Sequence, residues 1–416
     1  MSATSLSEII MRFVFGLMLL LSSLSWAPAA EPRLDKVDLF TANEGGYPLY
    51  RIPGIVVTAK GSLLAYCEAR KNAKGNWGHI DILVHRSTDG GATWAAPLKM
   101  PLPDGPLERN PAAVAKGLGK PGEITLNNPV AIVDHKTGTV VLLYCVEYGR
   151  CYSTISRDDG QTFSTPVDIT STFDKFRPEY EWKVLAVGPG HGIQLKNGRL
   201  VVAVWLSTGT GGHAHRPSVT TTIFSDDGGK TWQRGEIAAQ ETKPLINPNE
   251  TSLVELLDGR VLLNIRSESK EHRRAISFSK DGATGWTTPA FHDELLEPIC
   301  MASLCRLNEP AADDKTRLVF ANPHNLDRAD GKMAPGVGRD RKNVTIKLSN
   351  DEGTTWPISR SLELGKSGYS DLAVGSDGMI YCFYERGSSD GNYATKHLTV
   401  AKFNVEWLTD TKEADK

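Results

Sequence analysis

The stretch STDGGATW at residues 87–94 begins a pattern that returns along the chain. The pattern reads Ser-x-Asp-x-Gly-x-Thr-aromatic, and its other copies are SRDDGQTF at 156–163, SDDGGKTW at 225–232, SNDEGTTW at 349–356 and a divergent SKDGATGW at 279–286. Their aspartates lie 69, 69, 54 and 70 residues apart. A repeat of this length indicates copies of one supersecondary unit that are arranged radially or in a stack.

The residue types of the repeated box explain its local structure. Asp and Ser side chains accept hydrogen bonds from turn amides, glycine adopts positive φ without a steric penalty, and the aromatic residue can anchor the turn in an apolar layer. We therefore predict that each box is the turn of a β-hairpin and has no catalytic role.

Short apolar runs alternate with turn residues along the rest of the chain, and no long segment has a helical period. Six such runs each open on a turn or polar residue: 61–69, 138–148, 198–207, 259–267, 316–323 and 378–387. Evenly spaced strands of this kind indicate an all-β protein. With about 65 residues to a blade, the chain accommodates roughly six four-stranded blades. The prediction is a six-bladed β-propeller of four-stranded antiparallel blades.

The N-terminus differs from the rest of the sequence. An apolar run at 13–26 follows a basic residue and precedes small residues, which is the layout of a signal peptide over residues 1–30, with cleavage after Ala29 or Ala30. The alternative is an uncleaved anchor, although the run is shorter than the roughly 20 residues that span a bilayer. We expect residues 31–416 to form one catalytic propeller domain, secreted or periplasmic, with no integral membrane association after cleavage.

The net charge and the cysteines give further information on the class of protein. The net charge of −2 gives no electrostatic footprint for nucleic acid. Three of the six cysteines, Cys67, Cys145 and Cys382, lie inside apolar runs, where we expect small buried side chains. No spacing of Cys and His indicates a metal site or a disulfide framework.

The boxes resemble the Asp boxes of sialidase propellers, and three arginine motifs extend the resemblance over residues 39–399. Arg51 stands in YRIPGIVV, Arg266 in LLNIRSES and Arg341 in GRDRKNVTIKLS, with Arg339 as the alternative for the third. The resemblance implies that the three arginines bind the carboxylate of sialic acid. A guanidinium suits this role because it forms paired, charge-assisted hydrogen bonds with a carboxylate.

Two further motifs carry the expected chemistry. Tyr369 stands in GYSDLAV and Glu250 in NPNETSLVEL, and the resemblance implies that Tyr369 attacks the anomeric carbon while Glu250 takes its proton. A phenol with a pKa near 10 is a weak nucleophile, so it needs an adjacent base. The resemblance also implies that Glu385, in YERG, holds Arg51 in place.

The chain departs from the sialidase pattern at the general acid. The family has an aspartate where this chain has Asn76, in NWGHID, and an amide cannot donate or accept the catalytic proton. Three alternatives follow. His79 or Asp81 supplies the proton, the substrate is a different sugar acid, or the chain binds sugar without cleaving it.

These motifs together predict an exo-α-sialidase-like hydrolase that acts on a sialylated glycan, or another acidic sugar, with retention. This chemistry requires no metal or organic cofactor. The alternative is a sialidase-like lectin, which Asn76 favours and the retained Tyr369 and Glu250 do not. The loop GTGGHAHRPS at 209–218 is predicted to be a mobile surface loop, with a rim that contacts the aglycone as the second interpretation.

Overall fold

The repeated boxes form hairpin turns in the computed structural model, which describes residues 31–307, 316–334, 336–387 and 395–410. In the first box, Ser87 Oγ donates to Asp89 Oδ1 (2.8 Å), and the amides of Gly91 and Thr93 donate to Ser87 Oγ and Asp89 Oδ1 (both 2.9 Å). Ser87 is the last residue of β4 (Ile80–Ser87), and every other box likewise starts at the last residue of a strand. The prediction of structural turns is confirmed.

The described strands form five hydrogen-bonded sheets. The first two contain β2 (Leu49–Val57), β3 (Leu63–Arg70), β4 and β5 (Leu98–Lys99), then β6 (Leu126–Asp134), β7 (Thr139–Val146), β8 (Arg150–Ser156), β9 (Val167–Asp168) and β11 (Gly190–His191). The third and fourth contain β10 (Val184–Val187), β12 (Ile193–Gln194), β13 (Leu200–Ser207), β14 (Ser218–Ser225) and β15 (Gln233–Ala239), then β16 (Thr251–Glu255), β17 (Val261–Ile265), β18 (Arg273–Ser279) and β19 (Ala290–Leu296). The fifth contains β1 (Leu34–Thr41), β20 (Ser303–Arg306), β21 (Leu318–Pro323), β22 (Lys342–Ser349), β23 (Ile358–Val374), β24 (Ile380–Arg386) and β25 (His397–Phe403). Three short helices, α2 (Pro111–Val114), α3 (Thr170–Asp174) and α4 (Val405–Thr409), complete the described elements.

The fifth sheet consists of two four-stranded blades that share β23. The first half of β23 pairs with β22, from Leu348↔Ile358 to Lys342↔Lys366, and its second half pairs with β24 from Ser367 onwards. One long strand is therefore the outer strand of one blade and the inner strand of the next. With the other four sheets, this division gives the six blades that the sequence predicts.

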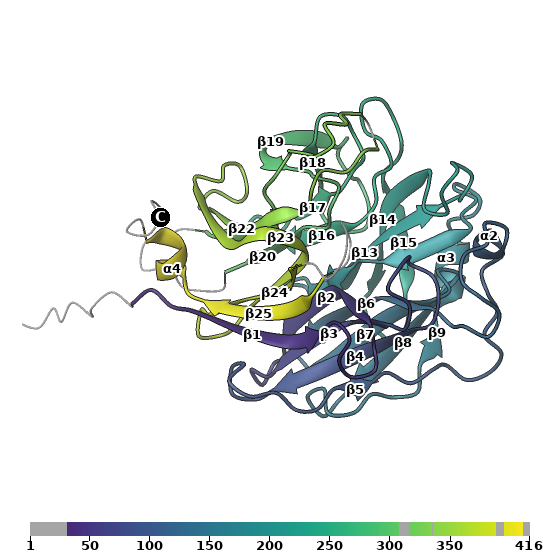
Figure 1. Cartoon of the computed structure of the whole chain (residues 1–416), viewed down its shortest axis with the longest axis horizontal. Coiled ribbons are helices and arrows are strands. Elements are labelled where there is room, and N and C mark those ends of the chain that lie inside the picture. Colours follow the sequence, from purple (N-terminus) through teal and green to yellow (C-terminus); the bar gives the residue numbers. More distant parts are fainter. Residues whose placement is uncertain (1–30, 308–315, 335, 388–394, 411–416) are drawn as a thin grey trace, which may run out of the picture.

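The N-terminal strand closes the ring of blades. β1 pairs antiparallel with β25, so the start of the described chain supplies the outer strand of the last blade (Figure 1). This blade carries no box because its outer strand comes from the opposite end of the chain. Five boxes in six blades are the consequence.

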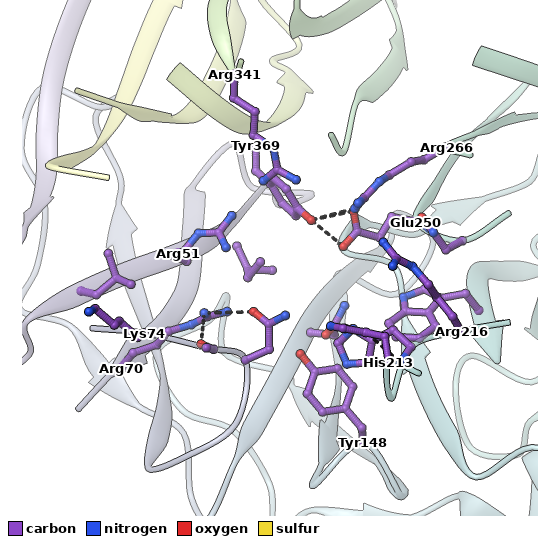
Figure 2. Close-up of a pocket in the computed structure, with 18 of the residues that line it drawn as sticks. Arg51, Arg70, Lys74, Tyr148, His213, Arg216, Glu250, Arg266, Arg341 and Tyr369 are labelled. Atoms are coloured by element: carbon purple, nitrogen blue, oxygen red, sulfur yellow. Dashed lines mark hydrogen bonds and ion pairs between the residues drawn. The ribbon is translucent and has the colours of Figure 1, made fainter. Parts of the chain in front are cut away.

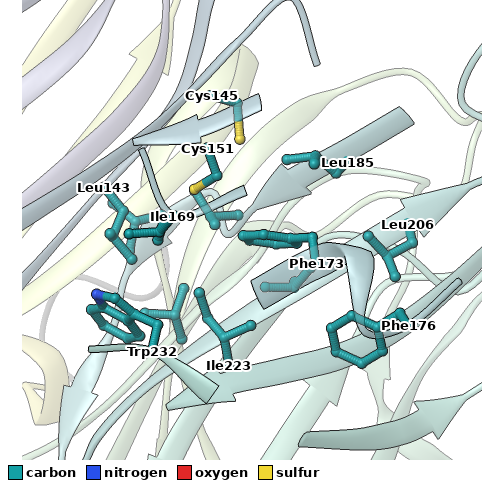
Figure 3. Close-up of a cluster of buried hydrophobic side chains, with 14 of the residues drawn as sticks. Leu143, Cys145, Cys151, Ile169, Phe173, Phe176, Leu185, Leu206, Ile223 and Trp232 are labelled. Carbon is teal, nitrogen blue, oxygen red and sulfur yellow. The ribbon is translucent and has the colours of Figure 1, made fainter. Parts of the chain in front are cut away.

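The apolar core lies between neighbouring blades. The largest cluster joins Leu143 and Cys145 of one blade with Leu206 and Ile223 of the next (Figure 3). All six cysteines are buried and unpaired, which confirms the expectation for the three in apolar runs. The six predicted apolar runs are all strands, and each is the second strand of its blade.

Blade geometry brings two sets of residues to one face. Inner strands start at this face, and the antiparallel second strands end there, so residues at these two positions lie around the central axis.

The predicted signal peptide lies outside the described residues. No helix in the described part of the chain has the length and apolar character needed to cross a bilayer.

Candidate active site

A cavity of about 500 Å³ opens at the face where the inner strands start. Six of its lining residues are Arg or Lys and two are Glu: Arg51, Arg70, Lys74, Arg216, Arg266, Arg341, Glu250 and Glu268. Figure 2 shows Arg51, Arg266 and Arg341 around Tyr369 on one side of the cavity, with Tyr148, His213 and Arg216 on the other. This excess of positive charge favours an anionic ligand.

Tyr369 and Glu250 form a close polar pair in this cavity. The Tyr369 hydroxyl lies 2.6 and 2.7 Å from the two carboxylate oxygens of Glu250 and donates to them. Arg266 donates through Nη1 to the Tyr369 hydroxyl (2.9 Å) and also contacts Glu250. Glu250 and Arg266 lie at the ends of the paired strands β16 and β17, whereas Tyr369 lies in β23 of a distant blade, so the propeller brings them together.

A β-bulge helps to direct the Tyr369 side chain. The pairing of β23 with β24 shifts register between Ser367 and Ser370, and Tyr369 lies inside this irregularity. Bulges commonly redirect one side chain in a strand. The phenol is 5% exposed, and burial followed by the Glu250 charge raises its pKa well above the usual range, against the opposing effect of the arginines. The resting phenol is therefore protonated, and it needs a base to act as a nucleophile.

Arg51 is held from behind by a buried carboxylate. Glu385 accepts from Arg51 Nε (2.9 Å) and Nη2 (3.2 Å), and it also accepts from the backbone amides of Ile52 (3.3 Å) and Tyr369 (3.0 Å). Burial alone would lower the pKa of Arg51, but Glu385 raises it above its ordinary value. Glu385 thus fixes both a guanidinium and the backbone of Tyr369.

Arg341, and not Arg339, completes the cluster of three arginines. The Arg341 guanidinium lies 5.1 Å from the ring centre of Tyr369 and donates to the Ile299 carbonyl (2.8 Å), while the Arg51 guanidinium lies 4.9 Å from the same ring. Arg339 lines a separate cavity. The structure thus brings the three predicted arginines together around the predicted tyrosine.

Asn76 lines the cavity, and Arg70 determines its orientation. Arg70 Nη1 donates to Asn76 Oδ1 (3.2 Å) and to the Gly75 carbonyl (2.7 Å). The Arg70 guanidinium is itself held by the fully buried Glu68, at 2.6 and 3.0 Å. Since the Asn76 oxygen accepts from Arg70, its amide NH₂ is left to donate to a ligand.

The structure does not support one of the three alternatives for the missing acid, in which His79 or Asp81 supplies the proton. Neither residue lines the cavity. His79 Nε2 instead lies 3.3 Å from Asp81, whose carboxylate also accepts from Tyr47 (2.6 Å) and pairs with Lys99 (2.8 Å). Burial would raise the pKa of Asp81, but Lys99 and Tyr47 outweigh it and lower the pKa. Asp81 is thus an ionised structural residue that holds His79 away from the cavity.

Part of the loop at 209–218 forms the cavity wall, which favours the second interpretation of this loop, a rim of the site, over a surface loop alone. His213, His215 and Arg216 all line the cavity. Arg216 donates to Glu268 (2.8 and 3.0 Å). Burial, followed by His213 and nearby arginines, lowers the pKa of His215 to about 3, so its imidazole is neutral under ordinary conditions.

The sequence offered weak signals for the additional cavity residues. Arg70 and Glu68 stand out as charged residues at the end of an apolar run, which is typical of a buried ion pair at a strand end. The Gly- and His-rich composition of the loop at 209–218 favours a mobile surface loop and gives only a weak sign of a role at the site. Within the described residues, no group of three or more His, Cys, Asp or Glu side chains is arranged to hold a metal ion.

Comparison with known proteins agrees with this geometry. The sequence model of the BNR repeat-like domain family matches residues 110–382. The chain belongs to the sialidase family. Similar relatives are the sialidases of Micromonospora viridifaciens, 28% identical over 92% of this chain, and Bacteroides fragilis, 30% identical over 83%. The solved structure of a Hadza microbial sialidase is 28% identical, with a TM-score of 0.69 over 90% of this chain and 69% of that one.

This sialidase-family chain spans little more than half of the length of these two relatives. The alignments cover 55% of the Micromonospora viridifaciens sialidase and 61% of the Bacteroides fragilis sialidase.

Proposed function

We propose that this chain is an exo-α-sialidase that hydrolyses terminal sialic acid from glycans with retention of configuration. The observation that carries the proposal is the Tyr369 hydroxyl, which donates to Glu250 (2.6 Å) beneath the guanidiniums of Arg51, Arg266 and Arg341. A protonated phenol paired with a carboxylate is an activated nucleophile. Three guanidiniums beside it suit a substrate that bears its carboxylate at the reacting carbon.

In the first step, the substrate carboxylate binds the three arginines and the anomeric carbon lies over the Tyr369 oxygen. The bond from the Tyr369 oxygen to this carbon forms, the bond to the leaving oxygen breaks, and the phenolic proton passes to Glu250. A neutral phenol approaches an anionic sugar without the repulsion that a carboxylate nucleophile would meet. The leaving oxygen departs with a negative charge, toward which the Asn76 amide can donate a hydrogen bond.

In the second step, water attacks the same carbon and the bond to the Tyr369 oxygen breaks. Glu250 returns its proton to the phenolate, and the proton of the attacking water passes to solvent. Arg266, which donates to the Tyr369 oxygen, stabilises the negative charge on this oxygen during both steps. Two displacements at one carbon give net retention.

The test is to trap the covalent intermediate. A fluorinated sialoside with a good leaving group forms the intermediate quickly and releases it slowly, so we expect its mass on the peptide that contains Tyr369. Tyr148 lines the same cavity and is the matched internal control, because a nonspecific label would reach it as well. A label on another residue, together with full activity of Tyr369→Phe, would refute the assignment.

A second candidate function rests on Asn76. A lectin that binds acidic sugar needs the arginines but has no use for an activated phenol. A hydrolase of alkyl glycosides needs a proton donor, and the Asn76 amide cannot be this donor. A substrate built on a different sugar acid is the third possibility, and the cavity residues His213, His215 and Arg216 would select it. Turnover of an aryl sialoside by the full chain separates the exo-α-sialidase from the lectin and from the hydrolase of a different sugar acid.

For localisation, we propose export, which the predicted signal peptide supports.

A further inference from the structure

A second cavity, of about 240 Å³, lies beside the active site and has no role in the proposed reaction. It is lined by Lys270, Glu271, His272, Leu326, Met333, Ala334 and Arg339. Two of its walls continue directly from the main cavity, because Glu268 and Arg341 line that cavity and are two residues from Lys270 and Arg339. Two residues of extended chain span roughly 7 Å, so the two cavities are neighbours.

Arg339 is a buried cation that no carboxylate neutralises among the described residues. Its side chain is largely enclosed, since the residue is only 5% exposed, and Nη1 donates to the carbonyls of Lys332 (3.2 Å) and Val337 (3.1 Å). The Nε atom is buried and has no hydrogen-bond partner in the described part of the chain. Burial, and then Arg328, lowers the pKa of Arg339. A buried guanidinium in this state is costly unless an anion binds it.

His272 and Glu271 present unused acceptors to the same cavity. His272 Nδ1 lies 3.0 Å from the Glu297 carbonyl, which can only accept, so Nδ1 carries the proton and Nε2 is an acceptor. That Nε2 atom and Glu271 Oε2 are both buried without a partner in the described residues, and His272 is 5% exposed. A hydroxyl or N–H group of a ligand would give both acceptors the donor that the described residues do not supply.

We propose that this second cavity binds a hydroxylated carboxylate, of the size and chemistry of one acidic monosaccharide. The ligand carboxylate pairs with Arg339, its hydroxyls donate to His272 Nε2 and Glu271 Oε2, and its C–H face packs on Leu326 and Met333. Lys270 at the rim adds a second positive charge, so two cations outweigh the single charge of Glu271. One ligand class thus satisfies the buried donor, both buried acceptors and the apolar wall.

The test measures binding of methyl glucuronide to the full chain by isothermal titration and by saturation-transfer NMR. Methyl glucoside is the matched ligand that lacks the carboxylate, and lactate is a hydroxylated carboxylate that is not a sugar. We expect methyl glucuronide to bind, methyl glucoside to bind at least about tenfold more weakly, and Arg339→Met to weaken methyl glucuronide by about 10- to 100-fold, as for loss of a charge-assisted contact. Lactate binding as tightly as methyl glucuronide would assign the site to small hydroxy acids and overturn the assignment to a sugar.

Variants separate the second cavity from the active site and from a folding defect. Ala334→Trp fills the cavity from an exposed position and should abolish binding without disturbing the core. Lys332→Met removes a charge from the same loop at a largely exposed side chain and should leave binding unchanged. Arg266→Met, at the active site, should also leave this binding in place. Binding that Arg266→Met abolishes, and that Arg339→Met and Ala334→Trp retain, would overturn the proposal whether or not the chain hydrolyses sialosides.

Discussion

Asn76→Asp should restore a proton donor to the active site, and the structure sets how large the gain can be. A well-placed general acid accelerates a reaction by about 10²–10⁴. The new carboxyl group would take the position of the amide, 3.2 Å from Arg70 Nη1. A guanidinium at this distance lowers a carboxyl pKa by about 1–3 units, so most of the new side chain would be ionised near neutral pH.

We therefore expect a gain near the lower end, about 10²-fold in kcat/KM, for substrates with a sugar alkoxide as leaving group. The gain should grow as the pH falls toward the lowered pKa, because a larger fraction of the new carboxyl group is then protonated. For aryl sialosides the gain should be small, since a phenolate departs without a proton. Wild type should accordingly cleave aryl sialosides far better than sialyl-oligosaccharides.

The assay compares kcat/KM for aryl sialosides of graded leaving-group basicity and for a sialyl-oligosaccharide, in wild type and variant. Asn128→Asp is the matched control, because Asn128 lines the same cavity and undergoes the same change of charge. A steep dependence on leaving-group basicity in wild type, flattened only by Asn76→Asp, supports the reasoning. Wild-type rates that are equal for aryl and natural substrates would refute it. If neither wild type nor Asn76→Asp turns over any substrate, the lectin candidate is favoured.

Two further variants test the carboxylate site and the boxes. Arg266→Lys keeps the charge but loses the planar donor that contacts Tyr369 and Glu250. The affinity for a sialic-acid analogue, measured by titration, should therefore fall by about 10- to 100-fold. Unchanged affinity would remove Arg266 from the site. Hydrogen bonds from Thr162 and Ser156 lower the pKa of Asp158 to about 2, so its contribution to stability is present above the unfolded-state pKa of about 4 and is lost as the pH falls toward 2. Asp158→Asn should therefore show a shallower loss of thermal stability than wild type between those pH values, and an identical slope would contradict this account of the box.

The fold was predictable because the boxes and the second strands are local signals. Each box satisfies its own turn through contacts within a few residues, so its structure does not depend on distant parts of the chain. The role of β23 was not predictable in this way. Its sequence gives no sign that one strand pairs with two different neighbours, because that pairing depends on where β22 and β24 lie in space.

In the candidate site, too, residues in local sequence motifs were predictable and residues placed by the arrangement of the blades were not. Tyr369, Glu250 and the three arginines were predictable because each stands in a recognisable motif. The opposite wall was not predicted as a whole, because Arg70 at the end of β3 and the loop at 209–218 approach the cavity only through the arrangement of the blades. His79 was a poor substitute for the missing acid for the same reason: closeness to Asn76 in the sequence did not place it in the cavity.

Glu385 connects the carboxylate site to the nucleophile, and this connection explains a glycine in the GYSDL motif. Its carboxylate binds the Arg51 side chain and the Tyr369 amide at once, and a Cβ atom at Gly368 would lie only 2.4 Å from Glu385 Oε2. Gln carries an NH₂ group in place of one carboxylate oxygen. In Glu385→Gln this NH₂ group would face an N–H donor of Arg51 or Tyr369, and the buried Arg51 would lose its counter-charge. Breaking a buried pair in this way costs about 3–5 kcal/mol, so the melting temperature should fall clearly.

Glu385→Gln should also affect catalysis in a way that loss of stability alone does not. Arg51 binds substrate and Tyr369 attacks it, so we expect a higher KM and a lower kcat together in protein that is still folded at the assay temperature. A substrate analogue with a carboxylate should raise the melting temperature of Glu385→Gln by less than that of wild type, since Arg51 is no longer held in position to bind it. Arg274→Met is the control for destabilisation alone, because Arg274 forms another fully buried pair, with Glu297, and does not line the cavity. If Glu385→Gln and Arg274→Met lose stability equally and neither changes KM, Glu385 supports the fold and does not position the site.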